Sequence, residues 1–292
     1  MEPVKERGGG KSLYGSMLRQ VELAGGQVKG LLWYQGESDA MGGAAEAYPK
    51  AFADFIAAVR SDFDQPELPF YLVQIGRFIH TSDLKGWNAV QEAQRLIPER
   101  VPNTAVVSVI DLELDDLIHV GTQGLKRAGV RLARIAQREL FGQLGGTTPT
   151  YDRVIRGANN TLVVKFKGVN LTPAGGGFGM GGFGMGGMGG GGMGGGFMQI
   201  GISGGGTHEF GLRPARHIGG FSIRKADGSE IPLIFEAAVG NARDTVVLKL
   251  ARPIPEEANL WYGYGMDPYC NLTDGLDMAV PVFGPVSLDD VR

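Results

Sequence analysis

Short apolar runs and longer segments with helical periodicity alternate over residues 29–140. The apolar runs lie at 29–34, 69–75 and 104–110. Segments whose apolar residues recur at helical spacing lie at 44–63, 87–97 and 123–140. Strands separated by helices of this length form a parallel sheet that is covered on both faces. The pattern therefore predicts an α/β fold for this part of the chain.

Two details of the helices are predicted from single residues. The helix over 87–97 is expected to stop before Pro98, because proline restricts the backbone of the residue that precedes it. The helix over 123–140 is expected to carry its apolar residues on one face, formed by Leu125, Val130, Leu132, Ile135 and Ala136.

The character of the sequence changes after Gly142. Short segments of alternating polarity, separated by turn residues, lie at 161–166, 218–224, 245–250 and 259–264. Segments of this kind predict a small antiparallel β domain. The predicted domains are therefore residues 1–142 and residues 143–292.

Degenerate Phe-Gly-Met-Gly-Gly units fill residues 175–206, inside the predicted β domain. A segment this rich in glycine buries too little surface to offset the entropy of ordering its backbone, so we expect disorder. Its Phe and Met side chains could serve as weak adhesive contacts in an interaction protein. A loop lengthened by repeat slippage explains the same composition more simply.

Charge and composition argue against several classes of partner. A net charge of −3 and an isoelectric point near 5.9 disfavour nucleic acid and anionic membranes, which bind basic surfaces. No apolar run approaches the roughly 20 residues that cross a bilayer. The single cysteine, Cys270, excludes an internal disulfide. Residues 1–12 are charged and glycine-rich, without the apolar core of a signal peptide, and the compartment stays open.

Polar residues follow two of the predicted strands. Gln35 and Gly36 come directly after the first, while Asp116 and His119 lie in the loop after the third. Ligands of α/β sheets bind beyond the carboxyl ends of the strands. The Asp-x-x-His spacing lets one loop hold a carboxylate against one imidazole nitrogen, which is the base and orienting half of a hydrolytic triad. The Gln35 amide and the Gly36 N–H suit an oxyanion hole.

Each of these residues also has a structural interpretation. Asp116 could simply cap a helix that has His119 in its first turn. Trp33 and Tyr34 are expected in the core rather than against a ligand. His80 could line the same cleft, although a surface position in a loop is the simpler expectation.

No metal site is predicted. His208 and His217 lie in the β half of the chain without companions at the spacing of metal ligands. We therefore assign neither histidine a role.

The block Trp-Tyr-Gln-Gly-Glu-Ser-Asp-Ala at residues 33–40 is similar to the third conserved block of the sialate O-acetylesterase and carbohydrate esterase family six proteins. These proteins are a branch of the SGNH hydrolases. Residues 13–18 resemble the segment that usually precedes the block. Asp116 and His119, with the helix behind them, resemble the last block of the family.

The resemblance extends into the second half of the chain. Matches to the carboxyl-terminal tail of the bacterial members are Tyr264, Pro268, Asn271, Leu272, Gly275, Leu276 and Pro281. In total the resemblance covers most of residues 12–140 and 245–286. The insert at 175–206 has no counterpart in it.

The resemblance implies a three-layer, flavodoxin-like sheet and a serine-hydrolase mechanism that uses no metal and no organic cofactor. His119 would be the general base and Asp116 its orienting partner, with Gln35 and Gly36 as oxyanion donors. The implied substrate is an acetylated carbohydrate, with xylan, sialic acid and other glycans all left open. The oligomeric state is equally open.

The family's nucleophilic serine lies in a Gly-Gln-Ser-Asn-like block after the first strand of the sheet, and no such block is found in this chain. Ser12, Ser16 and Ser38 stand in the wrong context, so no nucleophile is assigned. Without its first strand the sheet is expected to be incomplete at its amino-terminal side, with an open apolar edge. The chain is therefore expected to be a fragment of a longer product, or to have a misassigned start, and alone to be a weak enzyme. The alternative is a non-catalytic carbohydrate-binding or scaffolding protein that keeps the esterase fold.

Overall fold

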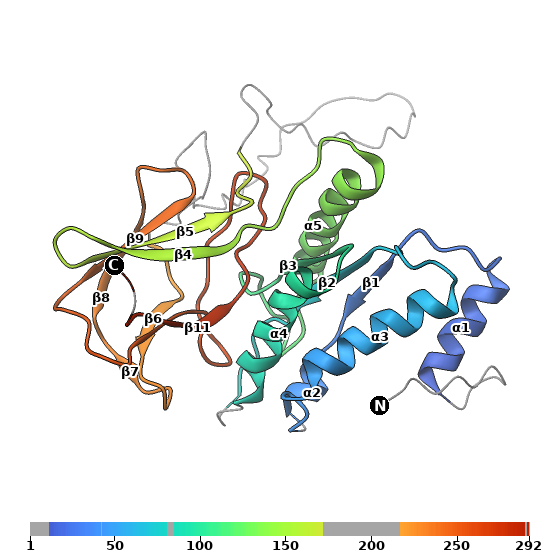
Figure 1. The fold of residues 1–292 in the computed structure, drawn as a ribbon, viewed down its shortest axis with the longest axis horizontal. Coiled ribbons are helices and arrows are strands. Elements are labelled where there is room, and N and C mark those ends of the chain that lie inside the picture. Colours follow the sequence, from blue (N-terminus) through green and yellow to red (C-terminus); the bar gives the residue numbers. More distant parts are fainter. Residues whose placement is uncertain (1–11, 42, 81–84, 172–216, 290, 292) are drawn as a thin grey trace, which may run out of the picture.

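The computed structural model describes residues 12–41, 43–80, 85–171, 217–289 and 291. An α/β unit forms one half of the molecule and two antiparallel sheets form the other (Figure 1). The insert predicted to be disordered at 175–206, and His208 close after it, lie outside the described residues. None of the helices in the described ranges is long and apolar enough to span a bilayer.

Three parallel strands form the sheet of the α/β unit, in the order β1-β2-β3. Their bounds are β1 (Leu31–Tyr34), β2 (Phe70–Gln74) and β3 (Thr104–Ser108). Each lies inside one of the three predicted apolar runs. The predicted α/β fold with a parallel sheet is confirmed.

Helices cover both faces of this sheet. α3 (Tyr48–Asp62) and α4 (Gly86–Arg100) pack against Phe70 and Leu72. α5 (Thr122–Phe141) packs against the opposite face. The two short helices of the unit are α1 (Leu13–Leu23) and α2 (Glu37–Met41). α1 is tied to α3 by the Tyr14 hydroxyl, which donates to Asp62 at 2.6 Å.

The expected stop of α4 before Pro98 is wrong, because the helix continues to Arg100. The Val101 N–H donates to the Ile97 carbonyl at 2.9 Å, so the turn that contains Pro98 stays closed. Ile97 and Trp87 are both buried in the core on the α4 side. Packing of the helix face therefore outweighs the local preference around proline.

The predicted apolar face of α5 is also wrong in part. Leu125 and Val130 are 49% and 48% exposed. The residues that α5 buries are Gly124, Ala128, Arg131 and Ile135. The two small residues let the helix approach the sheet, and the charge of Arg131 is neutralised by Asp111, whose carboxylate lies 2.7 Å away.

Two antiparallel sheets follow, in the orders β4-β5-β9-β8 and β11-β10-β6-β7. The first contains β4 (Thr150–Gly157), β5 (Thr161–Lys167), β8 (Ile234–Val239) and β9 (Thr245–Leu250). The second contains β6 (Phe221–Arg224), β7 (Glu230–Ile231), β10 (Asn259–Tyr262) and β11 (Phe283–Ser287). The antiparallel prediction is confirmed, although β4, β7, β8 and β11 were not predicted.

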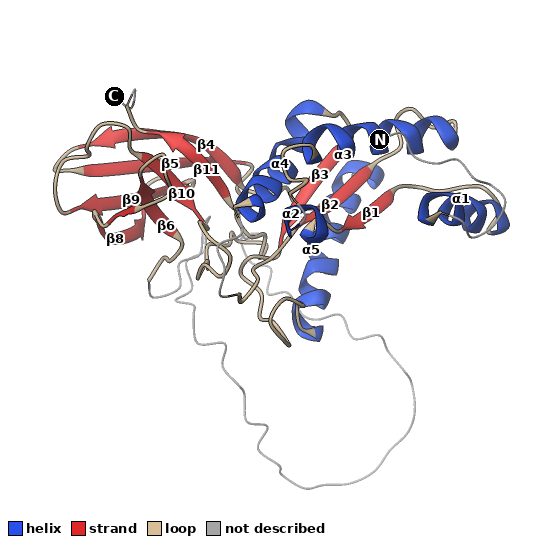
Figure 2. Cartoon of the chain, turned by 90° about the horizontal axis from the view of Figure 1, so that it is seen from below, coloured by secondary structure: helices blue, strands red, loops and turns tan. Residues whose placement is uncertain are grey.

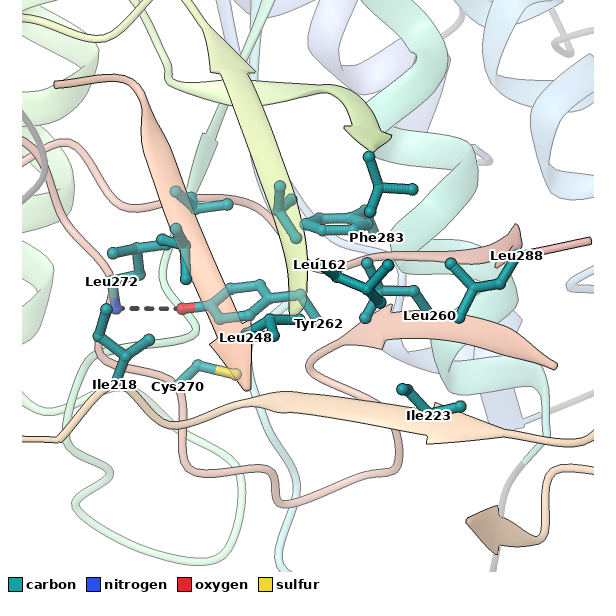
Figure 3. Close-up of a cluster of buried hydrophobic side chains, with 14 of the residues drawn as sticks. Leu162, Ile218, Ile223, Leu248, Leu260, Tyr262, Cys270, Leu272, Phe283 and Leu288 are labelled. Carbon is teal, nitrogen blue, oxygen red and sulfur yellow. Dashed lines mark hydrogen bonds between the residues drawn. The ribbon is translucent and has the colours of Figure 1, made fainter. Parts of the chain in front are cut away.

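One apolar cluster fills the space between these sheets (Figure 3). At its centre the ring of Tyr262 stacks on Phe283, with 5.9 Å between the ring centroids. The Tyr262 hydroxyl accepts a hydrogen bond from the Leu272 N–H at 3.1 Å. Cys270 is buried beside it. The domain division at residue 142 stays a prediction.

The segment before β11 returns to the α/β unit. Gln74, at the carboxyl end of β2, is fully buried and bonds to both main-chain groups of Val282, at 2.9 and 3.0 Å. Arg127 of α5 donates to both carboxylate oxygens of Asp277. These contacts fasten the carboxyl-terminal segment beside the carboxyl ends of the parallel strands.

β1 forms one edge of the parallel sheet (Figure 2). The Leu31 N–H donates to the Pro69 carbonyl at 2.8 Å, so the main-chain groups of the alternate residues, Leu32 and Tyr34, point away from β2. Leu32 is 63% exposed and Tyr34 is 39% exposed. Among the described residues no strand pairs with this outer edge.

Candidate active site

The loop that carries Asp116 and His119 is a tight hairpin between β3 and α5. Leu114 and Val120 pair across its base, and the Asp115 N–H donates to the His119 carbonyl at 2.9 Å. Within the turn, Oδ1 of Asp116 accepts from the N–H groups of Ile118 and His119 at 2.8 and 2.7 Å. The carboxylate is thereby fixed by its own loop, as Asp side chains are in turns.

The second oxygen of Asp116 lies 2.7 Å from Nδ1 of His119. Hydrogen bonds from the His119 main chain and ring, and from the Ile118 N–H, hold the pKa of Asp116 well below its usual range. The same carboxylate raises the pKa of His119, and the Glu37 charge adds to this effect. Because Nδ1 is engaged, Nε2 is the nitrogen left to exchange a proton.

The interpretation of Asp116 as a helix cap is wrong. α5 begins after Gly121, and no side chain caps it. Both members of the pair are exposed, His119 at 80% and Asp116 at 55% of the side chain. The pair is therefore presented to solvent at the carboxyl edge of the sheet rather than buried in a helix terminus.

Gln35 and Gly36 form the turn between β1 and α2. The Gln35 side-chain amide donates to Asp39 at 2.7 Å and, as an NH2 group, keeps a second N–H. Gly36 has φ +157°, and a Cβ built there would lie 2.8 Å from Nε2 of Gln94. The position therefore has room only for glycine.

The direction of the Gly36 N–H follows from the partners of its own peptide group. The Gln35 carbonyl accepts from Nε2 of Gln94 at 2.9 Å and from the Tyr48 hydroxyl at 3.3 Å. In a trans peptide the C=O and N–H point in opposite directions, so the N–H points away from these interior partners. In the part of the chain that the structure describes, the Gly36 N–H has no acceptor. It is thus a fixed and available donor, as an oxyanion site requires.

Three buried glutamines around this turn were missed in the sequence. Oε1 of Gln94 accepts from the Ile75 N–H at 2.8 Å, while Gln91 donates to the carbonyls of Ile75 and Gly76, both at 3.0 Å. Gln74 completes the group by donating to the Gln91 carbonyl at 2.9 Å. Buried amides must be satisfied in this way. Gln91 and Gln94 stand one helical turn apart, and this spacing was the available signal.

The two parts of the site both lie at the carboxyl ends of the parallel strands. Gly36 follows β1, the Asp116 loop follows β3, and the segment after β2 joins them. The Ile79 N–H donates to the Leu117 carbonyl at 2.7 Å, which ties the β2 segment to the Asp116 loop. His80 is exposed on the same segment, and its ring lies 4.9 Å from that of Phe78.

The serines that the sequence offered lie elsewhere. Ser12 caps α1, Ser16 lies within α1 and Ser38 lies in α2. Asp116 is the only hydrogen-bond partner of the His119 ring among the described residues. The core prediction is consistent with the contact of Trp33 to Phe55, at 4.8 Å between ring centroids, and is wrong for Tyr34, which is exposed on the edge strand β1. Within the described ranges there is no group of three or more His, Cys, Asp or Glu suited to a metal ion.

A family model described as carbohydrate esterase, sialic acid-specific acetylesterase, matches residues 3–138. The matched segment is just under half of the 292-residue chain. Both candidate parts of the site, Gln35 with Gly36 and Asp116 with His119, lie inside this matched segment.

Two similar proteins carry related names. A protein of Arabidopsis thaliana named as a probable carbohydrate esterase is 32% identical over 139 residues, which is 45% of this chain and 50% of the relative. The crystal structure of a carbohydrate acetylesterase from Xanthomonas citri shares the fold, with a TM-score of 0.62 and 23% identity, over 93% of this chain and 53% of that one. The chain thus spans about half the length of these relatives.

Proposed function

We propose that this chain forms the base and oxyanion half of the active site of a carbohydrate O-acetylesterase. The observation that carries the proposal is the 2.7 Å contact between His119 Nδ1 and Asp116 Oδ2, at the same sheet edge as the Gly36 N–H. The match of residues 3–138 to the carbohydrate esterase family model supports the substrate class. So does the Xanthomonas citri structure, which is titled a carbohydrate acetylesterase.

The proposed reaction is acyl transfer through a serine. Nε2 of His119 takes the proton as the serine oxygen attacks the acetyl carbonyl carbon, and Asp116 stabilises the imidazolium. The Gln35 amide and the Gly36 N–H donate to the oxyanion. Collapse of the intermediate breaks the ester bond, and His119 returns the proton to the departing sugar hydroxyl. Water then attacks the acetyl-serine by the same route and releases acetate.

The nucleophile is proposed to come from polypeptide outside these 292 residues. Two observations support this. The ring of His119 is hydrogen-bonded to Asp116, and to no serine, in the described part of the chain. The outer edge of β1 is open and bears the exposed apolar residue Leu32. A parallel strand paired there would place its carboxyl end beside Gly36.

Turnover of p-nitrophenyl acetate and of acetylated xylan tests the proposal. The 292-residue chain should fall about a million-fold short of a complete serine hydrolase, because the nucleophile is absent. A chain extended with the genomic sequence upstream, read in frame, should be active, and His119→Ala should abolish that activity. An extended chain that leaves p-nitrophenyl acetate untouched would refute the proposal.

A second candidate is a non-catalytic carbohydrate-binding protein with an esterase fold. The solvent-exposed His119 ring, with Asp116 as its sole hydrogen-bond partner among the described residues, favours it. Measurable sugar binding by the extended chain, together with turnover that His119→Ala does not change, would favour this candidate over the esterase.

A further inference from the structure

A cavity lies at the opposite end of the parallel sheet from the candidate active site. Its volume is about 720 Å³, within the range of small-molecule sites. The starts of β2 and β3 form its floor, the end of α5 forms one wall, and β4 and β5 contribute the other. Figure 1 shows the segment from α5 to β4 crossing between the two halves of the molecule. The cavity is therefore built by both halves of the chain.

Tyr71 of β2 is the most informative residue in this cavity. Its side chain points to the α5 face of the sheet, and the residue is only 4% exposed. Its hydroxyl nevertheless has no hydrogen-bond partner in the described residues. Among the described residues the one buried side-chain N or O atom without a partner is Nε1 of Trp33, so the small accessible part of Tyr71 includes its hydroxyl, which opens into the cavity. A phenol held in a sheet with its hydroxyl facing a cavity can bond to a ligand there.

Further polar groups converge on the same space. Burial and the nearby charge of Glu139 raise the pKa of Tyr71, so this phenol stays an uncharged donor beside a carboxylate. The Thr148 hydroxyl donates to the Val106 carbonyl on the free edge of β3. Lys167 lies at the rim, with its ammonium 3.5 Å from Glu99. Hydroxyls, an amide, two carboxylates and one ammonium therefore surround the cavity, which is lined by Glu67, Asn103, Thr104, Glu139, Thr147, Thr148, Thr150 and Lys167.

This lining selects the chemistry of the ligand. Two carboxylates against one lysine disfavour phosphates and other anions. Pro69, Pro98 and Leu140 add apolar patches between the polar groups. A ligand that carries many hydroxyls around C–H faces can satisfy both kinds of surface.

We propose that this cavity binds a neutral saccharide unit through Tyr71 and Glu139, separately from the site at Gly36 and His119. The proposal stands whether or not the chain hydrolyses esters. In a polymeric glycan the cavity would hold one part of the chain while another part reaches the opposite edge of the sheet.

Calorimetric titration of the full 292-residue chain with xylotetraose, mannotetraose and maltotetraose tests the proposal. At least one probe should bind. Tyr71→Phe should raise the Kd of that probe by about 3- to 10-fold, which is the change expected when one hydrogen bond is lost. Glu139→Gln should weaken binding of the same probe by a similar factor. Matched controls are Tyr269→Phe, which removes an exposed phenol elsewhere, and Glu256→Gln, which removes an exposed carboxylate; neither should change the Kd.

Amide shifts in an NMR titration locate the bound probe. Shifts should appear at Thr104 and Gly168, which line the cavity, and not at Gly36. The proposal is overturned if none of the three probes binds at millimolar concentration, or if Tyr71→Phe binds like the parent chain. It is also overturned if His119→Ala abolishes binding while Tyr71→Phe has no effect. If binding depends on Tyr71 and the extended chain has no esterase activity, the saccharide-binding proposal is supported. That result counts only against the proposed function.

Discussion

The side-chain amide of Gln94 donates to the main-chain carbonyl of Gln35 at 2.9 Å, from the buried face of α4. This bond fixes the peptide group that carries the Gly36 N–H. The same nitrogen would lie 2.8 Å from a Cβ at position 36, so Gln94 also explains why the turn needs glycine. A helix residue in the core thus sets the direction of a donor at the surface.

Replacing Gln94 with methionine, Gln94→Met, should leave this peptide group held only by the longer bond from the Tyr48 hydroxyl, at 3.3 Å, while keeping the volume of the side chain. The Ile75 N–H and the Gln35 carbonyl each lose a partner, so we expect a loss of about 1–3 kcal/mol in the free energy of unfolding. Urea denaturation measures this loss, and amide NMR should show a changed Gly36 signal. Gln137→Met, at an exposed position of α5, should change neither. An unchanged Gly36 amide in Gln94→Met would contradict the positioning role.

His119 should titrate above its ordinary pKa of 6.5, because the protonated ring is stabilised by Asp116. The raised pKa means that the contribution of the pair to stability is present below about pH 6.5 and is lost as the pH rises through the folded pKa. NMR of the imidazole protons follows the titration. Asp116→Asn should bring the midpoint back toward the ordinary value, while Asp115→Asn, one residue away, should leave it in place. Equal midpoints in the parent and in Asp116→Asn would rule out the pairing in solution.

Several strands of both the parallel and the antiparallel sheets were predictable from the sequence, because short apolar or alternating runs between turn residues are typical of strands. Residues 69–75 contain the parallel strand β2, which is buried at every position, and 245–250 coincide with the antiparallel strand β9. The end of α4 was not predictable. Pro98 argues locally for a stop, whereas the packing of Ile97 that overrides it is a tertiary contact.

The candidate site likewise has features that could be predicted from the sequence and features that could not. The Asp116 and His119 pairing follows from a spacing of three residues within one loop, and it is found at 2.7 Å. Their catalytic roles stay predictions. The contact of Gln94 with Gln35 joins residues 59 positions apart through a main-chain carbonyl, which leaves no trace in residue types. Arg131 is fully buried although arginine is normally exposed, so its partner Asp111 was needed to place it.

Removing the Asp111 carboxylate should therefore be costly. Arg131 is 0% exposed and donates to both oxygens of Asp111 at 2.7 Å. Asp111→Ala leaves this buried guanidinium with Asp277 alone as counter-charge, at 3.6 Å, and we expect a loss of about 3–5 kcal/mol. Asp152→Ala breaks the exposed pair with Arg153 and should cost less than about 1 kcal/mol. Thermal and urea unfolding of the two variants give the comparison, and similar losses in both would show that the buried pair is not specially stabilising.

The open edge of β1 should make the chain associate with itself. Leu32 is 63% exposed in the middle of a strand whose outer main-chain groups pair with no described strand, and such edges recruit further strands. Leu32→Lys places a charge on this edge and should shift the chain toward monomer in sedimentation velocity. Leu144→Lys changes an equally apolar and fully exposed residue in the loop after α5, and it should sediment like the parent. If the parent is already monomeric, or if both variants behave alike, the edge does not drive association. A monomeric Leu32→Lys beside an associating Leu144→Lys would locate the contact on β1, where the proposed function places the missing strand.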